Sequence, residues 1–312
     1  MKILTFDQIQ AILPTLDLLP AIEAGFAAYS AGKAVVPPVG ELLLNKGEVH
    51  IKYGYIEAQP YYVIKIASGF YENPALGLPS SDGLMLVFNQ STGQLVGILL
   101  DEGHLTNIRT AVAGAIAAKY LAPKNVKRIG IVGSGTQARL QLAYLKEITA
   151  CRDVLVWGLV PEELPAYQDE MTEQGFRVET TQNPAEILHF CNLVVTATPA
   201  TEPILQVVDL QPGTHITAVG SDTPEKQELQ AAILARADLV VADSISQCLA
   251  RGEIYQALKA GQIEQAQVVE LGNIIARKAY GRTSEALITV ADLTGVAVQD
   301  IQIASMVYEA AL

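Results

Sequence analysis

A glycine-rich segment, Gly133-Ser-Gly135-Thr-Gln-Ala138, has the spacing of a pyrophosphate-binding fingerprint. An apolar run at 127–133 leads into it, and a helical pattern begins directly after it. The first glycine permits a tight turn, the second lets the backbone approach a phosphate, and Ala138 is small enough for helix–strand packing. Free N–H groups at the helix N-terminus would face the anion. The segment predicts a dinucleotide site; an ordinary strand-to-helix turn is the alternative.

Three cationic side chains lie at positions where a positive charge is unfavourable without a partner. Lys65 lies inside the apolar run 61–67, where an ammonium is costly without a partner, unless it reaches water at a strand edge. Lys52 lies on the preceding run, and strand pairing could bring both onto one face. Arg109 lies in the first part of a helix, where acids are favoured, so it suggests a nearby anion. Together they predict a carboxylate-binding cluster.

Asp222 follows the apolar run 214–219 in the sequence Gly-Ser-Asp. Doubly wound folds bind their ligands at the carboxyl ends of parallel strands, where a carboxylate can act as a general base or bind an ammonium. The alternative is that Asp222 caps a helix predicted over 226–236. His50 and His104 flank the predicted site region, and the sequence leaves their roles open.

The second half of the chain alternates between strand and helix patterns. Repeated βα units of this length predict a doubly wound parallel sheet with helices on both faces, a Rossmann fold. In dinucleotide-binding folds an acid normally follows the second strand and binds the ribose. Here the second strand, 153–157, is followed by Gly158-Leu159, which supply neither an acid nor an arginine. The choice between NAD and NADP is therefore open. The strands are expected at 127–133, 153–157, 176–179, 192–197, 214–219 and 238–242, and the helices at 136–149, 161–174, 184–190 and 226–236, with a helical pattern continuing to about 278.

The first half of the chain has a different hydrophobic pattern. A capping box at 5–8 opens a short helix, and a second helix is expected from 17 to 30. A period of two then predicts a mainly antiparallel sheet in a second, α+β domain. A helix rich in small residues follows at 106–121, with Thr106 as its expected N-cap. The expected strands are 41–44, 48–56, 61–68, 84–88 and 95–101, and the chain closes with a strand near 288–290 and a helix at 298–311.

Composition narrows the class of protein. The chain has 312 residues, 50% hydrophobic and 17% charged, with a net charge of −12, which disfavours nucleic acid and anionic membranes as partners. Its apolar runs are too short for a transmembrane helix, and the N-terminal residues lack a signal-peptide pattern. Cys151, Cys191 and Cys248 are scattered without metal or redox spacing. A cytoplasmic protein without a bound metal is expected.

The residues around these motifs resemble the ornithine cyclodeaminase/mu-crystallin family over nearly the whole chain. The resemblance implies a homodimer whose subunit has a catalytic and dimerisation domain (1–122 plus 286–312) and a nucleotide domain (123–285). It implies that Lys65 and Arg109 bind the substrate carboxylate and that Asp222 is the acid/base at the reacting amine. The coenzyme-binding set is expected to be Gly133, Gly135, Thr136, Gln137, Ala138, Arg109 and Thr110. The segments that carry the resemblance are 105–111, 129–138, 219–229 and 292–295, with the strand around Lys65.

Departures from the family pattern shape the expected reaction. Glu225 stands where members often have glycine, and an upstream arginine for the carboxylate has no equivalent unless Lys52 serves. The segments 50–54 and 65–71 are similar to a subgroup associated with ectoine utilisation and iminosuccinate reduction. We therefore expect an NAD(P)H-dependent imine reductase or amino-acid dehydrogenase acting on a small 2-imino acid, iminosuccinate-like or alanine-like, with the three cations favouring two carboxylates. The alternatives are a cyclodeaminase that converts ornithine to proline and ammonia with catalytic NAD, and a non-catalytic small-ligand carrier.

Overall fold

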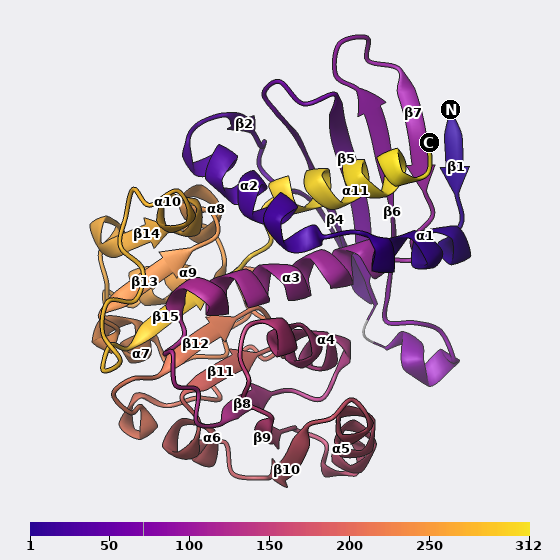
Figure 1. The fold of residues 1–312 in the computed structure, drawn as a ribbon. Helices are drawn as coiled ribbons and strands as arrows, with labels where there is room; N and C mark the ends of the chain where they lie inside the picture. The colour runs from indigo at the N-terminus through magenta and orange to yellow at the C-terminus, as the bar shows by residue number, and fades with distance from the viewer. Residues whose placement is uncertain (71) are drawn as a thin grey trace. The chain divides into compact units, whose positions relative to one another are not determined.

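A computed structural model describes residues 1–70 and 72–312, and the chain divides into two compact units (Figure 1). Unit 1 comprises Met1–Arg109 and Val296–Leu312, and unit 2 comprises Thr110–Gly295. Tyr71, the last residue of one segment used for the family resemblance, lies outside the described residues. We expected domain boundaries at 122/123 and 285/286. The two units divide after Arg109, within the helix His104–Leu121, and after Gly295, shortly before the last helix of the chain.

Unit 2 is built on an eight-stranded sheet in which every pair is parallel. The strand order is β10-β9-β8-β11-β12-β15-β13-β14, so the first five strands follow the Rossmann order. The predicted doubly wound sheet is confirmed. The strands are β8 (Ile129–Val132), β9 (Asp153–Trp157), β10 (Arg177–Thr181), β11 (Leu193–Thr196), β12 (His215–Ala218), β13 (Leu239–Ala242), β14 (Val268–Glu270) and β15 (Thr289–Asp292).

Helices cover both faces of this sheet because its strands are apolar on both sides. One face forms a core with α6, α7 and α9, and α4 packs on the other face. The small residues of α3 allow close packing, since a Cβ on Gly114 would clash with Gln141 Oε1 of α4. The helices are α3 (His104–Leu121), α4 (Thr136–Tyr144), α5 (Leu164–Glu173), α6 (Ala185–Phe190), α7 (Ala231–Arg236), α8 (Ile245–Cys248), α9 (Gly252–Lys259) and α10 (Leu271–Ile275).

Unit 1 is a mainly antiparallel seven-stranded sheet in the order β1-β7-β6-β5-β4-β2, with β3 also paired to β4. The α+β expectation is confirmed, with the addition of a parallel edge strand, β1. The last helix, α11, lies across β4, β5 and β6, and α2 packs on α11 (Figure 1). The elements are β1 (Lys2–Leu4), α1 (Phe6–Ile12), α2 (Leu18–Ser30), β2 (Ala34–Val35), β3 (Gly40–Leu44), β4 (Gly47–Ile56), β5 (Tyr61–Gly69), β6 (Ser81–Asn89), β7 (Leu95–Leu99) and α11 (Val298–Ala310).

Short 3-10 turns complete the chain at Leu13–Thr15, Asn73–Leu76, Leu145–Glu147, Pro161–Glu163, Val207–Asp209 and Gln265–Gln267. The capping box predicted for the first helix is present, with Thr5 N–H donating to Gln8 Oε1 at 3.0 Å. No single helix in the described ranges has the length and apolarity to cross a membrane. The bent pair Phe6–Thr15 and Leu18–Ser30 meets those two criteria only when taken together.

Three expected elements differ from the structure. The helix predicted from 226 begins at Ala231, because the residues before it are not helical and Leu229 forms a parallel bridge with Leu205. Thr106 is not an N-cap, since α3 already begins at His104 and Asp101 Oδ2 accepts the Leu105 N–H at 2.8 Å. A parallel strand, β14, interrupts the expected helical stretch before 278. The strand near 288–290 is β15, which pairs between β12 and β13 and so belongs to the sheet of unit 2.

Candidate functional site

The glycine fingerprint forms the turn between β8 and α4. Gly133 has φ +120°, and a Cβ there would lie 2.8 Å from the Ala197 carbonyl oxygen, so only glycine fits. Gly135 is the N-cap of α4 and has no atom within 4 Å of where a Cβ would be, which leaves its backbone open to a ligand. Ala138 is fully buried. The turn therefore fits a pyrophosphate, with Thr136 and Gln137 supplying N–H groups in the first turn of α4.

A cavity of about 720 Å³ opens beside this turn. It lies at the carboxyl ends of β8, β9 and β11, where the strand order reverses and open α/β sheets bind their ligands. Its size suits a dinucleotide part such as an adenosine. It is lined by Gly133, Ser134, Gly135, Trp157, Leu159, Val160, Glu163 and the segment 197–204.

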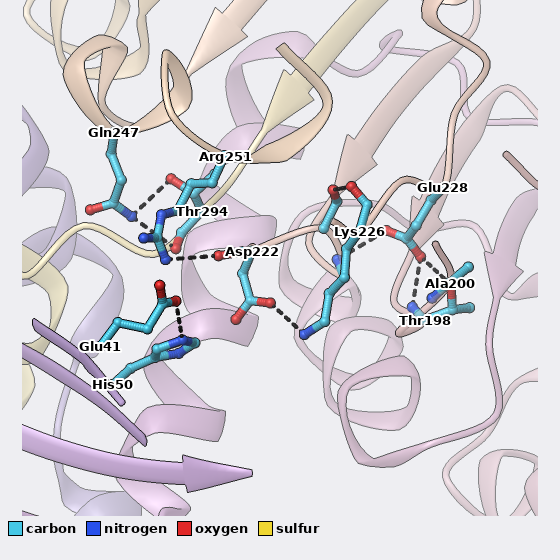
Figure 2. Close-up of polar contacts among 12 residues, drawn as sticks. Glu41, His50, Thr198, Ala200, Asp222, Lys226, Glu228, Gln247, Arg251 and Thr294 are labelled. Carbon is cyan, nitrogen blue, oxygen red and sulfur yellow. Dashed lines mark hydrogen bonds and ion pairs between the residues drawn. The ribbon is translucent and has the colours of Figure 1, made fainter. Parts of the chain in front are cut away.

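Asp222 lies in the loop that follows β12, at the same edge of the sheet (Figure 2). Its Oδ1 accepts a hydrogen bond from Lys226 Nζ at 2.8 Å, and its backbone carbonyl accepts one from Arg251 at 3.1 Å. The helix-capping alternative is wrong, because Gln230 is the N-cap of α7. Asp222 is thus a half-buried carboxylate held in a fixed loop by two cations that sequence reasoning did not assign.

Glu228 joins the loops after β11 and β12 (Figure 2). One oxygen accepts hydrogen bonds from the Thr198 N–H and hydroxyl at 2.6 and 2.8 Å. The other accepts from the Thr196 hydroxyl at 2.7 Å and the Gly220 N–H at 3.0 Å. Burial raises the pKa of Glu228 to about 7, and these four donors partly offset that effect. The clamp fixes the loop that carries Asp222.

The predicted cationic cluster forms in unit 1. Lys52 of β4 and Lys65 of β5 are directly opposite each other in the sheet and are 6% and 2% exposed. Both lie on the face that α11 covers, so Lys65 is not a strand-edge lysine reaching water. Arg109, 4% exposed, reaches the same helix from α3. The structure therefore brings two of the three cations side by side and links the third to Lys65 through a shared carboxylate.

That shared carboxylate is Asp300 of α11, which sequence reasoning missed. Its oxygens lie 3.4 Å from Lys65 Nζ and 2.9 Å from Arg109 Nε. The neighbouring Gln299 accepts a hydrogen bond from Arg109 at 3.0 Å, which fixes the orientation of its amide. Gln299 Nε2 is buried and has no hydrogen-bond partner in the described structure. A buried donor without a partner, beside a cation, suits an anionic ligand.

Burial, and after it the charge of Arg109, lowers the pKa of Lys65 to about 7. The charge of Asp300 raises this pKa but does not offset the two larger effects. A second buried acid, Asp101, also acts electrostatically on Lys65, and burial raises its pKa to about 6. Asp300 and Asp101 thus offset part of the positive charge of Lys65 and Arg109. The prediction of a dicarboxylate rested on three cations without acidic partners, and Asp300 pairs with two of them.

His50 and His104, whose roles the sequence left open, both contact other side chains of the protein. His50 Nε2 lies 2.9 Å from Glu41 Oε1, within unit 1 (Figure 2). His104 packs edge-to-face on Phe6, and burial lowers its pKa. Of the expected coenzyme residues outside the fingerprint, Thr110 accepts a hydrogen bond from Gln141 of α4 through its carbonyl. Arg109 instead contacts Asp300 and Gln299.

Comparison with known proteins identifies relatives of the whole chain. The model of the ornithine cyclodeaminase/mu-crystallin family matches residues 1–312. An uncharacterised cyclodeaminase of Sinorhizobium fredii is 41% identical, covering 100% of this chain and 96% of the relative. An alanine dehydrogenase of Archaeoglobus fulgidus is 34% identical (99% and 95%). An iminosuccinate reductase of Paracoccus denitrificans is 32% identical (100% and 97%).

Solved structures show the same fold over the whole chain. An archaeal alanine dehydrogenase dimer with bound NAD has a TM-score of 0.91 at 32% identity, covering 99% of this chain and 95% of that one. The Δ1-pyrroline-2-carboxylate reductase of Thermococcus litoralis, in complex with NADH and L-proline, has a TM-score of 0.94 at 28% identity (100% and 97%). A lysine cyclodeaminase has a TM-score of 0.88 at 26% identity (99% and 92%).

Proposed function

Because this chain belongs to the ornithine cyclodeaminase/mu-crystallin family, we propose that it is an NAD(P)H-dependent imine reductase, or amino-acid dehydrogenase, for a small 2-imino acid. The observation that carries the proposal is the buried arrangement of Lys65, Arg109 and Gln299, in which two cations lie close to an amide Nε2 that has no hydrogen-bond partner among the described residues. Buried charge of this kind is costly unless it serves a ligand. The carboxylate of an amino or imino acid is the matching anion.

Lys65 and Arg109 bind the substrate carboxylate and so orient the carbon that reacts. Lys52 strengthens the positive field at Lys65, and the Nε2 of Gln299, which has no partner among the described residues, donates a further hydrogen bond. Asp300 already pairs with both Lys65 and Arg109, so we favour a substrate with a single carboxylate, as in the imine formed from pyruvate and ammonia. Iminosuccinate is the second substrate of interest, because a relative is named for its reduction.

Asp222 is the proposed acid/base. A carboxylate at the carboxyl end of β12 can accept a hydrogen bond from a protonated imine nitrogen and stabilise the ammonium that forms. Lys226 holds its carboxylate, and Arg251 holds its backbone carbonyl. A nicotinamide coenzyme, when bound at the fingerprint of unit 2, supplies the hydride in one direction and accepts it in the other.

A homodimer is the proposed assembly. Tyr53, Ile64, Leu86 and Ile98 form a row across four strands of unit 1, on the face opposite Lys65. The row is partly exposed, and apolar surface of this kind marks interfaces. The alanine dehydrogenase relative was solved as a dimer, which supports the same assembly here.

The reaction is tested by three incubations of the purified protein. The first contains NADH, pyruvate and ammonia, the second contains NADH and iminosuccinate, and the third contains ornithine and a catalytic amount of NAD⁺. We expect net NADH oxidation in the first, dependent on ammonia. Proline formed from ornithine without net change in NADH would instead identify a cyclodeaminase, and turnover in none of them would leave a small-ligand carrier.

The role of Asp222 is tested by Asp222→Asn, with Glu225→Gln as the matched control. Asp222→Asn should lower turnover by at least about 100-fold, because general acid–base groups contribute on that scale. Its affinity for the coenzyme should stay within about twofold of the parent value. Glu225 is exposed in the same loop, so Glu225→Gln should keep full activity. Undiminished turnover in Asp222→Asn would remove this residue from the mechanism.

A further inference from the structure

The cavity beside the glycine turn has an acidic and otherwise apolar or uncharged lining. Within the described chain its charged lining residues are Glu163 and Glu202, and neither lysine nor arginine contributes to it. A phosphate monoester carries close to two negative charges at neutral pH and is normally bound by arginine or lysine. This lining therefore opposes the 2′-phosphate that distinguishes NADPH from NADH.

The end of β9 marks the side of the cavity that faces the adenosine ribose, because that is where dinucleotide folds place their ribose-binding acid. Here Gly158 occupies the position directly after the strand. A Cβ on Gly158 would lie 2.9 Å from Leu164 Cδ2 and 3.4 Å from Ser134 Oγ, so a carboxylate side chain at this position would be crowded.

Glu163 supplies a carboxylate at the same place from further along the chain. It ends the 3-10 turn Pro161–Glu163, and its Oε2 accepts a hydrogen bond from the hydroxyl of Ser134 at 2.8 Å. Ser134 lies between the two glycines of the fingerprint, so this bond holds the carboxylate against the phosphate-binding turn. Both residues line the cavity.

We propose that Glu163 selects NADH over NADPH. Its carboxylate accepts hydrogen bonds from the ribose hydroxyls of the adenosine and repels a phosphate attached at that position, and Glu202 adds to the repulsion. This inference rests on the proposed function for the presence of a nicotinamide coenzyme. It does not depend on which imine is reduced.

The test is a comparison of dissociation constants for NADH and NADPH, measured by titration of coenzyme fluorescence. The parent protein should bind NADH at least about tenfold more tightly than NADPH. Glu163→Gln keeps the size of the side chain and removes its charge, so NADH should bind more weakly and NADPH more tightly. The ratio of the two constants should therefore fall by at least about tenfold.

Glu162→Gln is the matched control, since Glu162 is the neighbouring exposed acid and lies outside the cavity lining. It should leave the ratio unchanged, and both variants should unfold at the parent temperature. Equal affinity of the parent for the two coenzymes, or an unchanged ratio in Glu163→Gln, would overturn the assignment of Glu163. Selective NADH binding without reduction of any imine would overturn only the proposed function, and binding of neither coenzyme would overturn both.

Discussion

Lys65 is a buried ammonium whose charge depends on conditions near neutral pH. Its surroundings lower its pKa to about 7, chiefly through burial and then through Arg109. A bound carboxylate would favour the protonated form and raise this pKa again. Binding of the proposed substrate would therefore be coupled to the uptake of a proton whenever Lys65 of the free protein has lost it.

We expect the affinity for a carboxylate ligand to fall as the pH rises. Between pH 6 and pH 9 the dissociation constant for pyruvate should increase, approaching about tenfold per pH unit above the pKa of Lys65. Calorimetric titration with the coenzyme-loaded protein measures this directly, since no imine chemistry is needed. An affinity that stays constant over this range would show that the charge of Lys65 is not used.

Two variants separate charge from shape at this position. Lys65→Arg keeps a positive charge at every pH in the range, so its pyruvate affinity should lose the alkaline decline. Lys65→Met removes the charge and should bind pyruvate at least about tenfold more weakly at pH 6. Both should bind the coenzyme as the parent does.

The sequence identified the site's cations but not their counter-charges. Lys52 and Lys65 could be predicted because an ammonium within an apolar strand needs a reason, and cross-strand pairing then placed them together. Asp300 could not be placed, because its partner Lys65 is far away in the sequence and no local pattern links them. The one available signal was an acid and an amide, Asp300 and Gln299, at the start of a helix that is otherwise largely apolar.

At the scale of whole elements, Glu228 holds together the loops at the carboxyl edge of the parallel sheet. Its side chain joins the segment after β11 to the segment after β12, and its backbone N–H donates to Glu253 of α9 at 2.7 Å. A single buried residue thus couples two strand ends and a helix. The position of the Asp222 loop follows from this arrangement.

Glu228→Gln should therefore destabilise unit 2. Each carboxylate oxygen accepts two hydrogen bonds, so an amide group in place of either oxygen faces donors that it cannot satisfy. We expect the free energy of unfolding to fall by about 2 kcal/mol, measured by urea denaturation. Glu225→Gln, exposed in the same loop, should change it by less than about 0.5 kcal/mol. Equal stability of the two variants would argue against the clamp.

The periodic elements of the chain were predictable, and those set by tertiary contacts were not. The alternation of strands and helices after 127 gave the parallel sheet, because apolar runs and turn residues repeat there at regular spacing. The start of α7 was misplaced, because Glu228 and Leu229 bond to Glu253 and Leu205 and so do not join the helix. β1 and β14 were missed because three-residue strands carry too little local pattern.

At the scale of the molecule, the sheet of unit 1 has a second apolar face. Tyr53, Ile64, Leu86 and Ile98 lie in register across it, and Tyr62 stacks on Phe88 with ring centroids 4.7 Å apart. Tyr53 remains 38% exposed. A face of this kind predicts association with a second copy.

Ile64→Glu should weaken the proposed homodimer, because it places a charge in the centre of this row. Light scattering coupled to size-exclusion chromatography should show the parent at twice the subunit mass and the variant shifted toward the monomer. Val208→Glu is the control, since Val208 is 82% exposed in unit 2, and it should remain dimeric. A monomeric parent, or an Ile64→Glu variant that stays dimeric, would contradict the assignment of this face.

The division of unit 1 into two chain segments affects how the protein is made. A ribosome has synthesised the sheet, Lys65 and Arg109 long before it reaches α11, because the whole of unit 2 lies between them in the chain. Until then the nascent sheet lacks the helix that covers it, and its ammonium and guanidinium groups lack the carboxylate of Asp300. Unit 1 can therefore complete its fold only after unit 2 has been translated.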